Sequence, residues 1–312
     1  MGADQGLSQG VMRGYDRAVL STWIQNSVDG VDRVLRQLKA FDEVDQFLFL
    51  AVNDIHPYDG LGYKFDTNVE THLPLADRFF DHTERTASVF LTNMRIYQEQ
   101  YLERVRQVDH NIGILLTYLE ENFAADEYIV SLYSDHGVPI FNKETSDKLD
   151  IISTYVSNAT WMMRGPGVPV GVRANELTSI VDIQRTLAHL CGFSVAACSD
   201  GNLPAVFGGR ERDVVCSTSQ FPGQTFKLAV RTHDHALRLE TQEFVDEDGR
   251  VDLAGATVGI YPREHELEEG YRLDSEELRA FFYPRARDFV REIASNGEHW
   301  PAMRAARPQW FG

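Results

Sequence analysis

Two continuous apolar runs dominate the hydrophobic pattern of the chain. Residues 128–133 are rich in β-branched and aromatic side chains, and residues 47–52 are apolar throughout. Runs of this length and composition are typical of strands that are covered on both faces of a parallel sheet. We therefore predict that both segments are central strands of one sheet.

Helical spacing of apolar residues predicts helices around the two runs. Apolar positions recur by threes and fours over residues 31–41, from about 86 to 119, and over 179–190. Asp29 is a plausible N-cap of the first helix, and Gly192 stands at a good C′ position after the third. The long second helix lies between the two apolar runs, and a strand–helix–strand crossover implies that the strands are parallel.

The second half of the chain shows weaker patterns. Residues 160–164 predict another core strand that runs into a rigid Gly-Pro turn, and the region before Pro222 is loop-rich. Residues 225–232 and 235–241 are two short β runs, which predict an antiparallel hairpin. After them, a capping-box pattern at Asp274 predicts a final helix, with Pro284 as a candidate kink.

Composition narrows the classes of protein to consider. The chain has 312 residues, of which 43% are hydrophobic and 25% charged, which is ordinary for a globular α/β protein, and no apolar run is long enough to cross a bilayer. The net charge of -17 argues against binding to nucleic acid or anionic lipid. The first residues lack a secretory signal, and three cysteines without metal or disulfide spacing suggest a reducing compartment, so we expect a cytoplasmic protein by default.

Both apolar runs are followed by residues that can carry chemistry. The first candidate is the sequence Asp135-His136-Gly137, which supplies a carboxylate oxygen, an imidazole nitrogen and a glycine that permits a close backbone turn. The second is His56, which precedes Pro57. Strands of one parallel sheet place such residues at the same edge. The alternatives are a solvated turn after the strand and a histidine that merely caps a strand end.

Five ordered landmarks resemble the sulfatase branch of the alkaline phosphatase superfamily. They are Phe47-Leu-Phe-Leu with Asp54-x-His56-Pro57-Tyr58, Val108-Asp109-x-x-Ile112-Gly113, Ser134-Asp135-His136-Gly137, Arg164-Gly165-Pro166-Gly167-Val168 and Val181-Asp182-Ile183-x-x-Thr186-Leu187. The resemblance covers roughly residues 31–232. It implies an alkaline-phosphatase-like α/β fold with a mostly parallel central sheet flanked by helices, followed by a small antiparallel hairpin and a helix. We therefore expect an incomplete sulfatase-like domain at 1–222 and a C-terminal subdomain at 223–312.

The resemblance also implies a site. Asp135 and His136 match the second pair of ligands to a divalent metal, which is usually calcium, or manganese or magnesium in relatives with a histidine ligand, and this donor pair also suits zinc. His56 matches the histidine that contacts the ester or protonates the leaving oxygen. The lysine that usually follows the Asp-His-Gly element corresponds to Lys143 or Lys148. The implied substrate is a sulfate ester of a small molecule or glycan.

The chain also departs from the family pattern. The family nucleophile is a cysteine in Cys-x-Pro-x-Arg, or a serine or threonine, and it lies N-terminal to the strand that corresponds to residues 47–52. This chain has too little sequence before that strand, and Cys191, Cys198 and Cys216 lack the proline and arginine. The match is thus to the C-terminal two-thirds of the domain, and we expect little sulfatase activity from this chain alone.

Three functions stay open from the sequence. The first is a sulfuric ester hydrolase whose site is completed by residues from elsewhere. The second is a phosphoesterase or phosphotransferase of surface polysaccharide metabolism, and the third is a catalytically inactive, truncated sulfatase-like protein.

Overall fold

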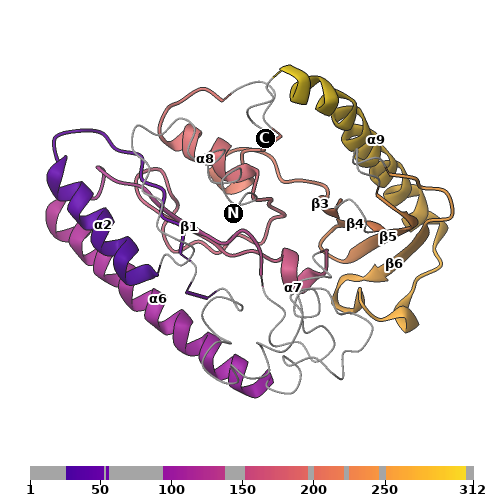
Figure 1. Cartoon of the computed structure of the whole chain (residues 1–312), viewed down its shortest axis with the longest axis horizontal. Helices are drawn as coiled ribbons and strands as arrows, with labels where there is room; N and C mark the ends of the chain where they lie inside the picture. Colours follow the sequence, from indigo (N-terminus) through magenta and orange to yellow (C-terminus); the bar gives the residue numbers. More distant parts are fainter. Residues whose placement is uncertain are drawn as a thin grey trace.

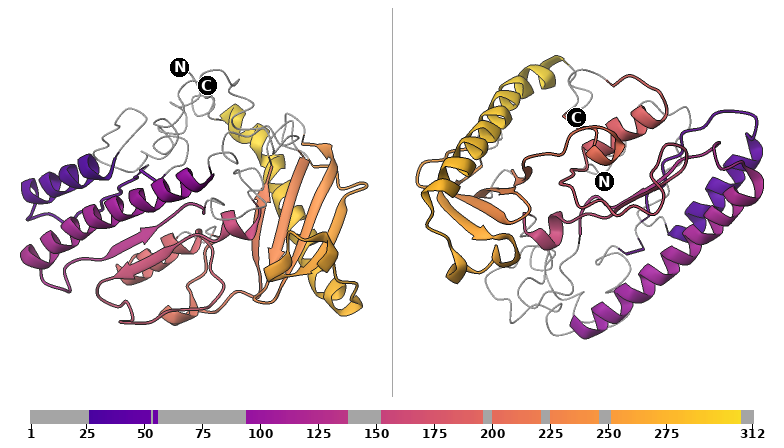
Figure 2. Two further views of the ribbon diagram at one scale, coloured as in Figure 1. Left: turned by 90° about the horizontal axis from the view of Figure 1, so that it is seen from below. Right: turned by 180° about the vertical axis from the view of Figure 1, so that it is seen from behind.

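The structure is a computed structural model, and the arrangement of its elements is shown in Figure 1. It describes residues 26–52, 54–55, 94–137, 152–195, 200–220, 225–245 and 251–306. Within these residues the elements form two groups at opposite ends of the molecule, which all three views in Figures 1 and 2 show. We call them the site-bearing lobe and the C-terminal lobe.

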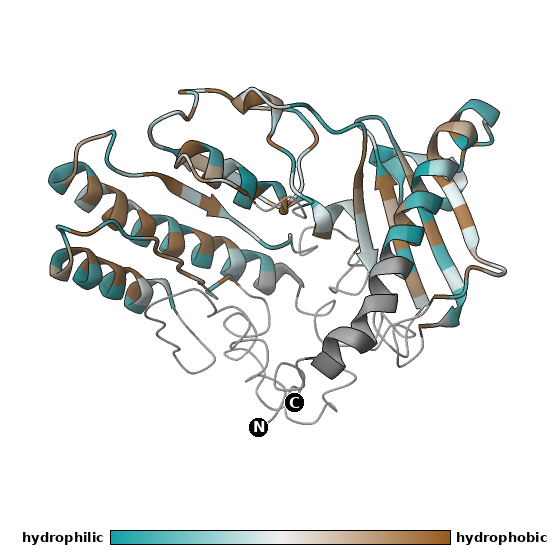
Figure 3. Cartoon of the chain, turned by 90° about the horizontal axis from the view of Figure 1, so that it is seen from above, coloured by the Kyte–Doolittle hydropathy of each residue, from teal (hydrophilic) through white to brown (hydrophobic). Residues whose placement is uncertain are grey.

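The site-bearing lobe contains three helices and two short strands. They are α2 (Ser27–Ala40), α6 (Met94–Asn122), β1 (Val130–Tyr133), β2 (Trp161–Arg164) and α8 (Asp182–Leu190). Helices α2 and α6 lie side by side, and hydrophobic and hydrophilic residues alternate around both of them in Figure 3. The predicted helices are thus confirmed. The N-cap of α2, however, is Asn26, whose side chain accepts a hydrogen bond of 2.8 Å from the Asp29 amide, and Asp29 lies in the first turn.

The predicted strand at residues 47–52 is not formed. This segment has no regular secondary structure, and Phe47 and Phe49 are exposed by 66% and 47%. Apolar composition indicates a preference for extended backbone, but a strand exists only where a neighbouring segment completes its hydrogen-bond ladder. Among the described residues no segment does so for residues 47–52, and the predicted crossover unit therefore lacks its first strand.

Strand β1 is confirmed, but its surroundings differ from the prediction. It pairs antiparallel with β2, in a register that places Val130 opposite Arg164 and Tyr133 opposite Trp161. Its residues are half-buried or exposed rather than covered on both faces. Because both sheets in the described part of the chain are antiparallel, a mostly parallel central sheet is not confirmed.

Helix α8 ends as its sequence predicts. The buried residues Ile183 and Thr186 form its inner face. Gly192 has φ of 73°, a left-handed conformation that glycine adopts without the steric cost of a side chain, and its amide donates to the carbonyl of His189.

The C-terminal lobe is an antiparallel four-stranded sheet covered by one long helix. Its elements are β3 (Val215–Ser219), β4 (Thr225–Arg231), β5 (His235–Phe244), β6 (Thr257–Pro262) and α9 (Glu276–Ala306), and the strand order is β3-β4-β5-β6. The predicted hairpin is β4–β5. Strands β3 and β6 were not predicted from the sequence, and β3 begins before the expected subdomain boundary at 222. Helix α9 continues through Pro284 as one helix, and a kink at this residue stays a prediction.

The hydrophobic core of the described residues belongs to this lobe. It is built from inward-facing side chains of the sheet and from one face of α9, namely Phe226, Leu228, Val230, Leu237, Leu239, Val245, Ile260, Phe282, Ala286 and Val290. Five of them are at most 1% exposed. At about 25 cal/mol for each Å² of buried apolar surface, such a cluster is the main source of stability in a lobe of this size.

Short elements connect the two lobes. Helix α7 (Thr154–Ser157) lies at the junction in Figures 1 and 2, between β1 and the sheet. A single 3-10 turn, η4 (Ala205–Phe207), lies between α8 and β3, and two more, η5 (Arg263–His265) and η6 (Glu269–Tyr271), lie between β6 and α9 within the C-terminal lobe. No helix in the described part of the chain has both the length and the apolarity needed to span a membrane.

Candidate metal centre

The turn after β1 carries the two predicted metal ligands. The strand pairing ends at Ser134, whose amide donates to the carbonyl of Thr160 at 3.0 Å, while its hydroxyl accepts from the Thr160 amide at 2.9 Å. The next residue, Asp135, has a side chain that is 83% exposed, and the side chain of His136 is 34% exposed. The chain therefore leaves the sheet at a defined point and presents both side chains at the surface.

A backbone contact sets the imidazole tautomer of His136. Its Nδ1 lies 2.7 Å from the carbonyl oxygen of Gly137. A carbonyl can only accept a hydrogen bond, so Nδ1 must carry the proton and Nε2 keeps its lone pair when the ring is neutral. Histidines that bind metals are commonly held in this way, with one nitrogen donating to a carbonyl and the other facing the metal.

The free donors of the two side chains face one another. Nε2 of His136 lies 3.6 Å from Oδ2 of Asp135, while the other carboxylate oxygen, Oδ1, accepts the His136 amide at 2.9 Å. Two metal–ligand bonds of about 2.1 Å can span this separation. The two residues therefore fit a divalent cation as neighbouring ligands.

Helix α7 contacts the backbone of the same turn at Gly137. The amide of Gly137 donates to the carbonyl of Val156 at 2.6 Å. A Cβ atom on residue 137 would lie closer than contact distance to the carbonyl oxygen of Tyr155, and 3.3 Å from that of Asn158. Glycine is needed here because the backbone of α7 occupies the space of a side chain.

No third donor joins Asp135 and His136 among the described residues. Among them, no group of three or more histidine, cysteine, aspartate or glutamate side chains is arranged to hold a metal ion. The predicted site residues His56, Lys143 and Lys148 lie outside the described residues, and their roles stay predictions. Asp109 and His110 are exposed on α6.

The cysteine environments differ. Cys191 is exposed, whereas Cys216 in β3 is partly buried. Burial raises the pKa of the Cys216 thiol to about 11, so this thiol is a poor nucleophile near neutral pH.

Two landmark aspartates turn out to brace the backbone. Asp54 is buried and accepts hydrogen bonds from the amide and hydroxyl of Ser27, at 2.6 and 3.0 Å, and Asn111 of α6 donates to that hydroxyl at 2.7 Å. Asp54 thereby ties the segment just before His56 to both helices. The sequence analysis did not assign this role to Asp54. The feature that could have indicated it is the position of this aspartate just after an apolar run.

Asp182 plays a similar part at the start of α8. Its carboxylate accepts the amides of Ser179 and Asn202, at 2.8 and 2.6 Å, and forms an ion pair with Arg212. The side chain is only 2% exposed. Asp182 therefore holds the N-terminus of α8 in place through its contacts with the backbone and with Arg212.

Comparisons with known proteins agree on one family. A Caenorhabditis elegans protein named as an extracellular sulfatase Sulf-1 homologue is 26% identical over 161 residues, which are 51% of this chain and 22% of that protein. A protein of Bacteroides thetaiotaomicron named as a sulfatase has a similar structure, with a TM-score of 0.61 and 15% identity over 94% of this chain and 71% of that one. A sulfatase of glycosaminoglycan metabolism from the same organism gives a TM-score of 0.60 and 18% identity over 82% and 56% of the two chains.

The structural similarities show an alkaline-phosphatase-like fold of the sulfatase kind. This chain spans about a fifth of the length of the Caenorhabditis elegans relative. The model of the Sulfatase family matches residues 13–193, which include the turn with Asp135 and His136. The chain therefore belongs to the sulfatase family.

Proposed function

We propose that this protein takes part in the metal-dependent hydrolysis of sulfate esters on a glycan, with Asp135 and His136 as two of the metal ligands. Family membership supports the reaction class. The substrate class is supported by the similarity to a sulfatase of glycosaminoglycan metabolism. The observation that carries the proposal is the pair of free donors 3.6 Å apart, with the His136 tautomer set by the carbonyl of Gly137.

The proposed reaction assigns separate tasks to the residues. A divalent cation bound at this pair would act as a Lewis acid that neutralises the charged oxygens of the ester. In hydrolysis the sulfur exchanges its bond to the alcohol oxygen for a bond to an oxygen from water, and one proton reaches the departing alkoxide. His56 is the proposed donor of that proton or contact to the ester, and Lys143 or Lys148 is the proposed partner of the negatively charged sulfate.

Metal binding tests the ligand assignment directly. We expect Asp135→Ala and His136→Ala each to weaken Mn²⁺ or Ca²⁺ binding by more than about 10-fold in titration calorimetry, because each removes a direct ligand. His110→Ala is the matched control, since it removes an exposed histidine of α6. Metal affinity that is unchanged in both Asp135→Ala and His136→Ala would refute the assignment.

Activity separates the sulfatase proposal from the phosphoesterase alternative. Since only two donors converge among the described residues, we propose that the purified chain by itself turns over little aryl sulfate. Robust turnover of an aryl sulfate would contradict this. Turnover of an aryl phosphate well above that of the matching sulfate would replace the sulfatase proposal with the phosphoesterase one.

A further inference from the structure

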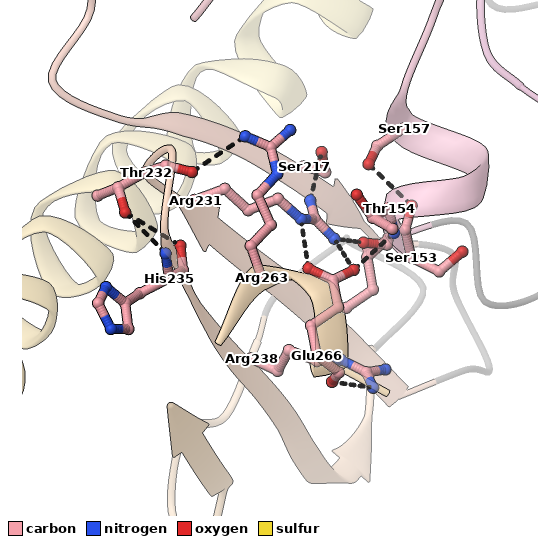
Figure 4. A network of polar contacts seen from close by, with 11 residues as sticks. Ser153, Thr154, Ser157, Ser217, Arg231, Thr232, His235, Arg238, Arg263 and Glu266 are labelled. Carbon is pink, nitrogen blue, oxygen red and sulfur yellow. Dashed lines mark hydrogen bonds and ion pairs between the residues drawn. The ribbon is translucent and has the colours of Figure 1, made fainter. Parts of the chain in front are cut away.

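A buried ion pair in the C-terminal lobe reaches into the junction between the lobes. Arg231 at the end of β4 donates from Nε and Nη2 to the two carboxylate oxygens of Glu266, at 2.7 and 2.8 Å, as Figure 4 shows. The side chains are 2% and 1% exposed. Removing two charges from water is costly, and a well-packed apolar pair at such a place is often as stable or more stable. The burial of this pair is therefore weak evidence of a stabilising role, and its other contacts are informative.

The remaining contacts of the pair lead to helix α7. Nη2 of Arg231 also donates to the carbonyl of Ile152, and Oε1 of Glu266 accepts the amide of Thr154 at 2.5 Å. The N-cap residue of α7, Ser153, makes no capping hydrogen bond with its own side chain. The side chain of Glu266, which belongs to the C-terminal lobe, thus caps the N-terminus of α7 at the Thr154 amide (Figure 4).

Two further arginines lie close to Glu266. Arg238 donates to the backbone carbonyl of Glu266 at 3.3 Å, and Arg263 lies beside the pair in Figure 4. Burial, and then the neighbouring charge of Arg231, lower the pKa of Arg263. The side chain of Glu266 and its backbone carbonyl thus accept hydrogen bonds from two guanidinium groups of this junction.

Helix α7 cannot fix its own position. It has only four residues, and a single helical turn is unstable unless other parts of the protein hold it. Its Val156 carbonyl accepts the amide of Gly137, and the Gly137 carbonyl in turn accepts the proton of His136 Nδ1. The position of α7 thereby sets the orientation of the proposed metal ligand.

We infer that Arg231 and Glu266 are positioning residues for the metal site, acting through α7 on the Gly137 carbonyl and on the tautomer of His136. This inference rests on the proposed function in treating His136 as a ligand. Neither residue of the pair contacts Asp135 or His136, so the coupling passes through the backbone of α7 and Gly137. The C-terminal lobe would then prepare a site that lies in the other lobe.

Two double variants separate positioning from stability. Arg231→Met with Glu266→Leu replaces the pair by apolar side chains of similar length, which should preserve folding but removes the cap on Thr154. Arg231→Met with Glu266→Gln differs only in keeping an uncharged acceptor that can reach the Thr154 amide. Val290→Ala, in the same core but away from α7, is the control for a general loss of stability.

The first measurement is the tautomer of His136 in the metal-free protein. It is read by nitrogen NMR of labelled histidine at a pH where imidazoles are neutral, with the signal assigned by its loss in His136→Gln. We expect a single Nδ1-protonated form in the wild type, in Val290→Ala and in the glutamine double variant. The leucine double variant should show a mixture of tautomers, and a wild-type-like signal from it would overturn the inference.

The second measurement is Mn²⁺ affinity. We expect the leucine double variant to bind about 10-fold more weakly, the usual effect of losing a residue that orients a ligand, and the glutamine double variant to recover much of this loss. Equal affinities of the two double variants would overturn the inference. If the wild type binds no Mn²⁺, the proposed function fails, while the tautomer experiment still decides the positioning role.

A milder variant covers the case in which the leucine double variant does not fold. Glu266→Asp keeps a buried charge opposite Arg231 but withdraws the carboxylate from Thr154 by one methylene. A mixture of His136 tautomers in this variant supports the inference, and an unchanged single tautomer contradicts it.

Discussion

The C-terminal lobe and the site-bearing lobe differ in the kind of contacts that they bury. In the C-terminal lobe, apolar side chains such as Phe226 and Phe282 are removed from water almost completely. In the site-bearing lobe, Phe47, Phe49 and Met162 remain largely exposed, and the best-buried contacts there are polar, such as Asp182 with Arg212. Among the described residues, the C-terminal lobe thus has the larger apolar cluster, whereas hydrogen bonds and ion pairs fix the turns of the site-bearing lobe.

This difference matches what each lobe has to do. Hydrophobic burial is non-directional and tolerates small shifts of the side chains, so it supplies stability without fixing any single atom. Hydrogen bonds require defined distances and angles, and they can therefore hold two metal donors in one orientation. The turn at Asp135 and His136 is fixed by such bonds, which the amides of Ser134 and Gly137 donate to the carbonyls of Thr160 and Val156.

The largest expected contrast concerns two phenylalanines. Phe282→Ala, in the core of the C-terminal lobe, should reduce the free energy of unfolding by about 3–5 kcal/mol because it leaves a cavity. Phe49→Ala should change it by only about 0.5 kcal/mol, since the ring is already half exposed. Urea denaturation followed by circular dichroism measures both, and similar losses in the two variants would contradict the proposed difference between the lobes.

A pair of glycines gives a contrast of intermediate size. Gly137→Ala should reduce stability by about 1–3 kcal/mol and weaken metal binding, because a Cβ would collide with the backbone of α7. Gly113→Ala, in the middle of α6 with nothing near the added methyl group, should instead increase stability by about 0.5–1 kcal/mol. Thermal denaturation and Mn²⁺ titration distinguish the two. A Gly137→Ala protein as stable as the wild type would show that α7 does not constrain the turn.

The smallest expected effect belongs to Tyr261 of β6. Its hydroxyl donates to Glu269 at 2.5 Å, and burial together with this bond raises the pKa of Tyr261 to about 12 from the ordinary 10.0. Tyr261→Phe should cost about 1 kcal/mol near neutral pH. The tyrosine contribution is complete below pH 10.0 and is lost as pH rises toward 12, because the unfolded chain ionises first.

The pH dependence of this variant has a second branch. The same hydrogen bond lowers the pKa of Glu269, so the contribution of that carboxylate is present above its ordinary pKa and is lost as pH falls into the acid range. Unfolding free energies of the wild type and Tyr261→Phe, compared from acid to alkaline pH, should differ most near neutrality. A difference that does not change with pH would show that the bond to Glu269 is not formed.

Local pattern was sufficient for much of the architecture. Helices α2, α6, α8 and α9, strands β1 and β2 and the β4–β5 hairpin follow from periodicity and from turn residues such as Gly192, whereas the single turn of α7 was not predicted. Strand β3 escaped prediction because its polar residues, such as Ser217 and Thr218, weaken the pattern, and β6 because Gly259 interrupts it and Pro262 ends it. Their pairing with β4 and β5 completes the sheet.

The apolar run at 47–52 failed as a predicted strand for the opposite reason. Its composition favours extended backbone strongly, yet pairing depends on a partner segment that no local pattern supplies.

The sequence by itself determined the chemical candidates and the family. The order Asp135-His136-Gly137 after an apolar strand specified two donors and a glycine, and the family comparison bears out the resemblance. Only the tertiary structure decided how these donors are held. Arg231 and Glu266 lie far from the turn in sequence, and their link to it through α7 depends on long-range backbone contacts that leave no local pattern.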